Sequence, residues 1–147
     1  MGKAGFNERK FNKLIIERFG YNFLNGKKVF KSKSEDISIS VDNSLYTSAL
    51  DLLFEIDSGN MAKLLAGQYI FLNILNNRKS NKIFVVIHYY KNYNSSRTIK
   101  NLNLINREIY KNLGIPILAF NVLEFIDFVN DCNSKEEFVN KLKSKVQ

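Results

Sequence analysis

Three carboxylates alternate along one short apolar segment of the chain. The segment runs from Leu50 to Asp57, and its acids are Asp51, Glu55 and Asp57. In a β-strand successive side chains point to opposite faces, so all three acids would share one face. Carboxylates on an otherwise apolar strand are costly to desolvate without a counter-charge. Because Mg²⁺ prefers hard oxygen ligands, we expect a divalent cation at this strand.

The segments around this strand predict a mixed fold of helices and strands, of the α/β (α+β) class. Hydrophobic spacing predicts helices over 6–19, 61–75, 98–113, 123–129 and 135–145. Alternation or apolar runs predict strands over 27–33, 35–42, 50–57, 82–90 and 115–120, with a turn over 43–48. The order αβββαβαβα predicts a mixed central sheet with helices on both faces, in a single domain spanning residues 1–147.

Composition narrows the class of protein. The 147 residues carry a net charge of +8, which favours a polyanionic partner, although a lysine-rich sequence from an AT-rich genome gives the same charge. With one histidine (His88) and one cysteine (Cys132), a zinc site or a Cys/His nucleophile pair is almost excluded. We expect His88, which ends an apolar strand, to be structural rather than catalytic.

The expected location is the cytoplasm. Cys132 cannot form an internal disulfide, which indicates a reducing compartment. No apolar leader opens the sequence and no segment is long enough to span a bilayer, so we expect no membrane association.

The acidic strand continues into a recognisable motif. The run Glu55-Ile56-Asp57-Ser58-Gly59-Asn60-Met61-Ala62 follows the segment Ser34-Glu35-Asp36-Ile37. Together they resemble the PD-(D/E)XK nucleases, and within them the type II restriction endonucleases of the BamHI-like group, whose signature is Glu-x-Glu-x-Gly-Asn-x-Ala/Ser. In this resemblance Glu35 replaces the proline that precedes the acid in the family. The element order matches over most of the chain, and individual residues match over 36–62.

The resemblance implies a restriction-endonuclease-like core and Mg²⁺-dependent hydrolysis of DNA, with Mn²⁺ able to substitute. Asp36 and Glu55 would hold the metal. Asp57 stands where many members have lysine, so it could bind metal, act as a general base, or do neither. Lys63, in the first turn of the next helix, would replace the missing lysine.

The partner of Glu55 depends on the hairpin. If residues 44–47 form its loop, Asp36 lies directly across from Glu55, with Cβ atoms roughly 5 Å apart. Asp42 lies on the same strand face and is the alternative acid. Glu8, on the first helix, matches an acid that some family members use beside the metal. Asp51 lies deeper on the strand, and we expect it to pair with a lysine.

A second motif carries aromatic, amide and cationic side chains between a central strand and a helix. Cations neutralise phosphates, and Arg and Asn can read base edges in the major groove. The candidate DNA-binding residues are Lys91, Asn92, Asn94, Arg97 and Lys100, with Arg107 and Lys111 extending the same helix. A further basic strip consists of Lys27, Lys28, Lys31 and Lys33.

These observations favour a small Mg²⁺-dependent endonuclease acting on double-stranded DNA, most simply a type II restriction enzyme. A palindromic target would demand a two-fold symmetric protein, so we expect a homodimer. Two alternatives stay open on the sequence: a structure-selective nuclease such as a junction resolvase, and a non-catalytic nucleic-acid-binding module on a degenerate nuclease fold.

Overall fold

Four strands form the central sheet of the protein. In the computed structural model, which describes residues 5–59, 61–76, 81–89 and 92–146, they are β3 (Asn43–Tyr46), β4 (Asp51–Asp57), β5 (Lys82–His88) and β6 (Ile117–Asn121). Their order across the sheet follows the chain, with β3 antiparallel to β4 and the other neighbours parallel. The expected mixed sheet is confirmed.

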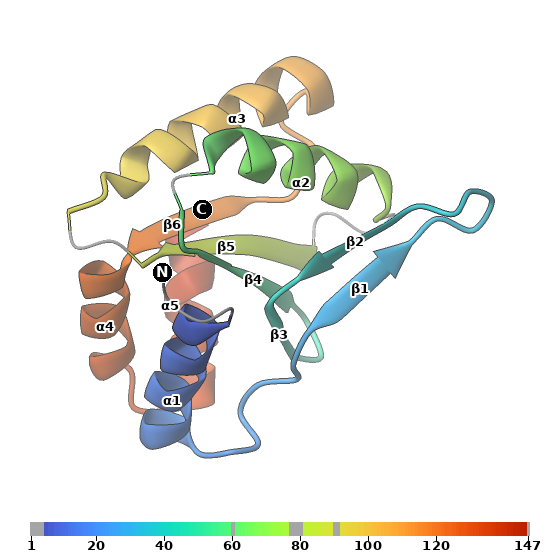
Figure 1. Cartoon of the computed structure of the whole chain (residues 1–147). Helices are drawn as coiled ribbons and strands as arrows, with labels where there is room; N and C mark the ends of the chain where they lie inside the picture. The colour runs from blue at the N-terminus through green and yellow to red at the C-terminus, as the bar shows by residue number, and fades with distance from the viewer. Residues whose placement is uncertain (1–4, 60, 77–80, 90–91, 147) are drawn as a thin grey trace.

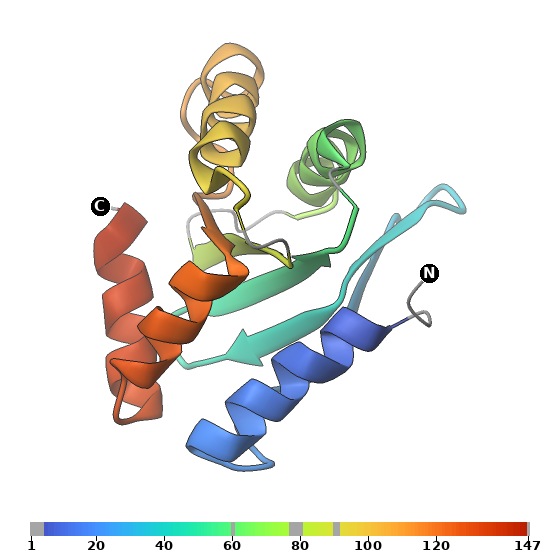
Figure 2. The ribbon, with the colours of Figure 1, turned by 60° about the vertical axis from the view of Figure 1, so that its left-hand side comes forward.

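Helices cover both faces of this sheet (Figure 1 and Figure 2). One face is covered by α2 (Ala62–Ile74) and α3 (Ser95–Tyr110), the two crossovers between parallel strands. The other is covered by α1 (Phe6–Phe19), α4 (Val122–Asn130) and α5 (Lys135–Val146). Among the described residues, no helix has both the length and the apolar character needed to cross a membrane.

The alternation in β4 separates two apolar cores. Leu52, Phe54 and Ile56 pack into the core below α1, α4 and α5, whereas Leu53 packs into the core below α2 and α3. Because side chains alternate along a strand, Glu55 and Asp57 are carried on the same face as Leu53. The acids therefore lie on the side of the sheet that α2 and α3 cover.

A two-stranded ribbon extends from the sheet. It consists of β1 (Lys28–Lys31) and β2 (Ser38–Val41), which are antiparallel, with Lys31 opposite Ser38 at the far end (Figure 1). Both strands were expected, but the structure shortens them, and residues 32–37 form the tip. We call these elements and their tip the β1–β2 ribbon.

The turn expected over 43–48 is wrong, because residues 43–46 form strand β3. Asn43 and Ser44 are residue types typical of turns, yet both are buried, and their side chains bond to neighbouring segments. Asn43 accepts from the Gly26 N–H (3.0 Å) and donates to Asn12 Oδ1 (2.8 Å), while Ser44 donates to the Gly26 carbonyl (2.6 Å). The real turn follows β3 and is closed by Thr47 N–H bonding to the Leu50 carbonyl (2.9 Å).

Candidate functional site

Asp42 and Glu55 form the centre of the site. Asp42 lies where the chain leaves β2, which pairs with β1, and enters β3, which pairs with β4. The Asp42 N–H donates to Glu55 Oε2 (3.2 Å), and the Ile56 N–H donates to Asp42 Oδ2 (2.8 Å). Each carboxylate thus accepts a backbone hydrogen bond from the other's segment, which holds the two acids side by side.

The electrostatics of this pair favour a bound cation. Burial, together with the nearby charges of Asp42 and Glu8, raises the pKa of Glu55 to about 7 against hydrogen bonds that lower it. Burial also raises the pKa of Asp42, with the charge of Glu8 adding to the rise. Two desolvated carboxylates that lie close together are costly to ionise at the same time, and a bound cation would lower this cost.

Glu8, in the first turn of α1, lines a cavity of about 390 Å³ that Glu55 and Asp57 also line. We call it the carboxylate cavity. The charge of Glu8 also acts on Asp42. Glu8, Asp42 and Glu55 therefore lie near one another, although they come from an N-terminal helix, a strand junction and a central strand.

Two lysines lie beside the pair. Lys27 and Lys63 line a second cavity of about 580 Å³ between the β1–β2 ribbon and α2, which Glu55 also lines. We call it the arm cavity. The charge of Lys27 lowers the pKa of Asp42 against the larger effect of burial. Gln68 donates to the Ser40 carbonyl (2.9 Å) and hydrogen-bonds Glu55, so it links α2 to both strands.

Asp57 is buried and bonds to other groups than this pair. Its Oδ2 lies 2.7 Å from His88 Nδ1, and its Oδ1 accepts from the Gly59 N–H (3.3 Å). Burial raises the pKa of Asp57, but the hydrogen bonds from His88 and Gly59 and the charge of His88 outweigh it, and the net shift is downward. His88 Nε2 lies 2.7 Å from Thr98 Oγ1 in α3. As expected, His88 is fully buried with both ring nitrogens bonded.

The expected pairing of Asp36 with Glu55 is wrong. Asp36 lies in the exposed tip of the β1–β2 ribbon (Figure 1), and β2 pairs with β1 rather than with β4. The alternative acid, Asp42, occupies the position next to Glu55. Asp51 pairs with Lys82 (3.7 Å), as expected for an acid at the start of β4.

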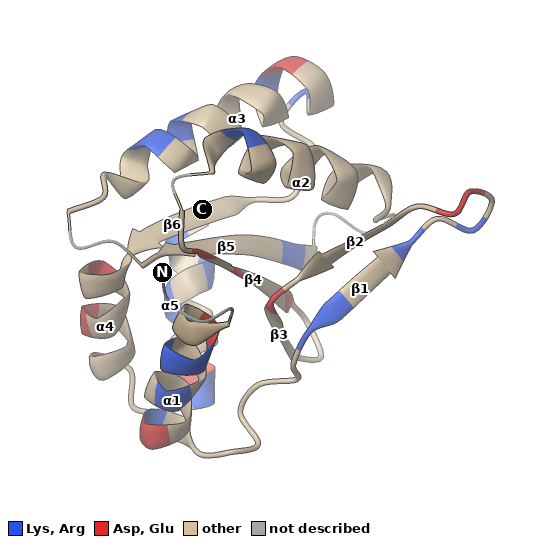
Figure 3. Ribbon diagram, viewed as in Figure 1, with Lys and Arg blue, Asp and Glu red and all other residues tan. Residues whose placement is uncertain are grey.

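The residues expected to contact DNA have different environments. Lys91 lies outside the described residues. Asn94 caps α3, because its side chain accepts from the Ser96 N–H (3.1 Å), and Asn92 is exposed before it. The Lys and Arg positions of α3 are blue in Figure 3. Four cations are exposed: Arg97, Lys100 and Arg107 in α3 and Lys111, the residue that caps it.

Three contributors to the site were not singled out from the sequence: Lys27 as the cation beside Asp42, Gln68 as a partner of Glu55, and Thr98 as a partner of His88. Lys27 was noted only as part of a basic strip. Gln68 carried a usable signal, because a polar residue in the apolar run 68–72 needs a hydrogen-bond partner. No local signal marks Thr98.

The donor chemistry fits a hard divalent cation. Within the described ranges, no group of three acidic, histidine or cysteine side chains has the arrangement of a complete metal site. Mg²⁺ does not require one, because proteins usually bind it through one or two carboxylates, with waters and substrate phosphates completing the shell. Asp42 and Glu55 supply such a carboxylate pair, and Glu8 is an additional acid that lines the carboxylate cavity.

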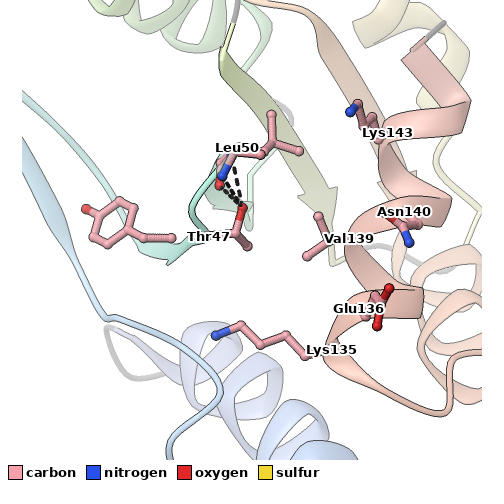
Figure 4. Close-up of a pocket in the computed structure, with 9 residues that line it drawn as sticks. Thr47, Leu50, Lys135, Glu136, Val139, Asn140 and Lys143 are labelled. Atoms are coloured by element: carbon pink, nitrogen blue, oxygen red, sulfur yellow. Dashed lines mark hydrogen bonds between the residues drawn. The ribbon is translucent and has the colours of Figure 1, made fainter.

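A further cavity lies at the opposite end of β4, between the β3–β4 turn and α5 (Figure 4). Its volume is about 450 Å³, and Tyr46, Leu50 and Val139 line it together with Lys135 and Lys143. The Thr47 hydroxyl beside it is already bonded to Leu50. This cavity contributes nothing to the carboxylate chemistry.

Comparisons of the chain with protein-family models, with curated proteins and with solved structures gave no significant match.

Proposed function

We propose that this protein is a divalent-metal-dependent endonuclease that hydrolyses phosphodiester bonds in DNA. The observation that carries the proposal is the Asp42–Glu55 pair, in which two desolvated carboxylates are held together by reciprocal backbone hydrogen bonds. Lys27 and Lys63 line the adjoining cavity. Carboxylates beside lysines provide both the ligands for a cation and the positive charge that a phosphodiester needs.

The metal would be Mg²⁺, with Mn²⁺ able to substitute, held by Asp42 and Glu55. When bound, it would supply charge stabilisation for the phosphate and acidify a coordinated water. Each of these carboxylates is already held by a backbone hydrogen bond from the other's segment.

The remaining residues would position the substrate and move the proton. Lys27 and Lys63 attract the phosphate and balance the charge that accumulates on its oxygens. Glu8 is a candidate to accept the proton from the attacking water, because it lines the carboxylate cavity with Glu55. Asp57 has a structural role in this proposal, because its carboxylate is engaged by His88 and Gly59.

The exposed cations of α3 would bind the DNA backbone. Arg97 and Lys100 lie in the first half of α3, the next element after β5, and α3 covers the same face of the sheet as α2. Phosphate contacts fix the register of a protein on a duplex without reading sequence. The proposal has two finer forms: sequence-specific cleavage by a homodimer, as in type II restriction enzymes, and structure-selective cleavage of DNA that is not a continuous duplex.

Paired substitutions test the proposal. Asp42→Asn and Glu55→Gln each remove a metal-binding charge, and each should lower Mg²⁺-dependent cleavage of plasmid DNA by about 100-fold or more, because several kcal/mol of transition-state stabilisation is lost. Asp36→Asn is the matched control and should cut like the wild type.

Two results would contradict the proposal. If the wild type binds DNA in Ca²⁺ but cuts none in Mg²⁺ or Mn²⁺, the protein is a non-catalytic binding module. If Asp36→Asn abolishes cleavage and Asp42→Asn does not, the site is misassigned.

A further inference from the structure

The arm cavity is large enough for a ligand of its own and adjoins the carboxylate pair. Its volume of about 580 Å³ lies within the range of about 300–1,000 Å³ typical of small-molecule sites. Glu55, Leu64 and Gln68 line both the arm cavity and the carboxylate cavity. A group bound in the arm cavity would therefore lie next to the proposed metal ligands.

The walls of the arm cavity are largely apolar, with one aromatic ring. Leu64 and Phe71 line it from α2 and are 60% and 42% exposed. Val29 and Ile39 line it from the β1–β2 ribbon. A phenylalanine ring exposed among aliphatic side chains offers a stacking surface, and every nucleobase has a face that can stack on it.

Gly67 keeps the arm cavity open. It lies within α2 between Leu64 and Phe71, where glycine weakens a helix relative to alanine. A Cβ atom added at Gly67 would meet no heavy atom within 4 Å, so the fold itself has no steric need for glycine there. A larger side chain at Gly67 would instead extend into the cavity that this residue lines.

The charge of the cavity lining complements a nucleotide. Lys27 and Lys63 line the arm cavity, and Glu55 is the only acid among the described residues that line it. Ser38 and Ser40 from the β1–β2 ribbon and Gln68 from α2 add polar groups to the lining. Apolar walls with two cations and a few polar groups match a base attached to a phosphate.

We propose that the arm cavity binds a single unpaired nucleobase, which stacks on Phe71 while its phosphate lies beside Lys27 and Lys63. This inference rests on the proposed function for the identity of the polymer, DNA, and narrows the substrate class to DNA with an unpaired or extruded nucleotide. It therefore favours structure-selective binding over binding to a continuous, fully paired duplex.

Fluorescent duplexes test the inference without cleavage. One short duplex carries 2-aminopurine paired with thymine, and the other carries it as a single unpaired nucleotide, with Ca²⁺ in place of Mg²⁺. The wild type should bind the unpaired form about tenfold more tightly or better, as expected from one stacked base. The 2-aminopurine fluorescence should rise when the base leaves the helical stack.

Two variants test whether the binding preference depends on the arm cavity or on the rest of the surface. Gly67→Leu places a side chain at the cavity wall, where its Cβ meets no heavy atom within 4 Å. This variant should abolish the preference while leaving the melting temperature equal or higher. Phe71→Ala should reduce the preference by about tenfold. Ile74→Ala is the matched control, because Ile74 is exposed on the same helix but does not line the cavity.

Three outcomes would overturn the inference. The first is equal affinity of the wild type for the two duplexes, and the second is a preference that persists in Gly67→Leu. The third is that Gly67→Leu and Phe71→Ala keep the preference but change the oligomeric state, as measured by light scattering. That result would assign this face to contact with a second copy of the chain. Because binding is read in Ca²⁺, the result does not depend on whether any DNA is cleaved in Mg²⁺.

Discussion

At the scale of single residues, the chemistry depends on where each carboxylate finds its hydrogen bonds. Glu55 and Asp57 are two positions apart on the same strand face, yet their pKa values move in opposite directions. Burial raises both, but Glu55 adjoins two other acids, whereas Asp57 bonds His88. Neighbouring acids of one motif can therefore have different roles.

The raised pKa of Glu55 predicts how stability depends on pH. Since the pKa rises from 4.5 to about 7 on folding, the folded state binds this proton more tightly than the unfolded state does. The free energy of unfolding should then fall as pH rises from about 4.5 to 7 and level off above that range. Urea denaturation across this range should show that Glu55→Gln removes most of the fall. An unchanged pH profile in this variant would contradict the assignment.

Asp57→Asn separates a structural role from a catalytic one. Asparagine can still accept from His88 but loses the charge, so the free energy of unfolding should drop by about 2 kcal/mol. Mg²⁺-dependent cleavage under conditions where the variant is folded should stay close to that of the wild type. A loss as large as that expected for Glu55→Gln would place Asp57 among the metal ligands.

At the scale of elements, α3 connects the site to the proposed DNA surface. Its Thr98 bonds His88, whose other nitrogen bonds Asp57 at the end of β4. Its cations Arg97, Lys100 and Arg107 are exposed. The position of the proposed DNA-binding helix is thereby fixed relative to the strand that carries Glu55.

The cations of α3 can be tested through salt dependence. Replacing both Arg97 and Lys100 with alanine should weaken DNA binding and reduce the slope of log K against log salt by about 2, one for each lost phosphate contact. The matched control replaces Lys135 and Lys143, exposed on α5 across the sheet. An equal effect of the two double variants would show that only net charge matters.

At the scale of the whole molecule, stability rests on a cluster of phenylalanines on the side of the sheet opposite the acids. The ring of Phe138 in α5 lies 5.3 Å from that of Phe23, 5.3 Å from that of Phe128 and 6.3 Å from that of Phe54, centroid to centroid. This core joins α5, α4 and β4 without involving the site. The free-energy cost of desolvating Asp42 and Glu55 is thus offset by the packing of this separate core.

Phe138→Ala tests this division. Removing a fully buried ring should lower the free energy of unfolding by about 3–5 kcal/mol. Asn140→Ala, an exposed change on the same helix, should stay within about 0.5 kcal/mol of the wild type. Urea denaturation provides both values, and a cost below 1 kcal/mol for Phe138→Ala (about what a surface change produces) would contradict the packing described.

The sequence by itself determined the order of most elements and the face of β4 that carries Glu55 and Asp57. Both follow from local hydrophobic periodicity, because apolar residues recur at the positions of a helix or strand that face the core. Strand β3 was not predicted, because Asn43 and Ser44 are polar. Their side chains form hydrogen bonds with partners such as Asn12 and Gly26, which are far from them along the chain.

Only the tertiary structure decided which residues meet. Asp42 rather than Asp36 adjoins Glu55, since the chain changes strand partners at residue 42. Asp57 hydrogen-bonds His88, and His88 hydrogen-bonds Thr98. These residues come from segments whose contact no local sequence pattern predicts. Periodicity fixes the face on which a side chain lies, but its partner depends on strand register and on free energies summed over the whole fold.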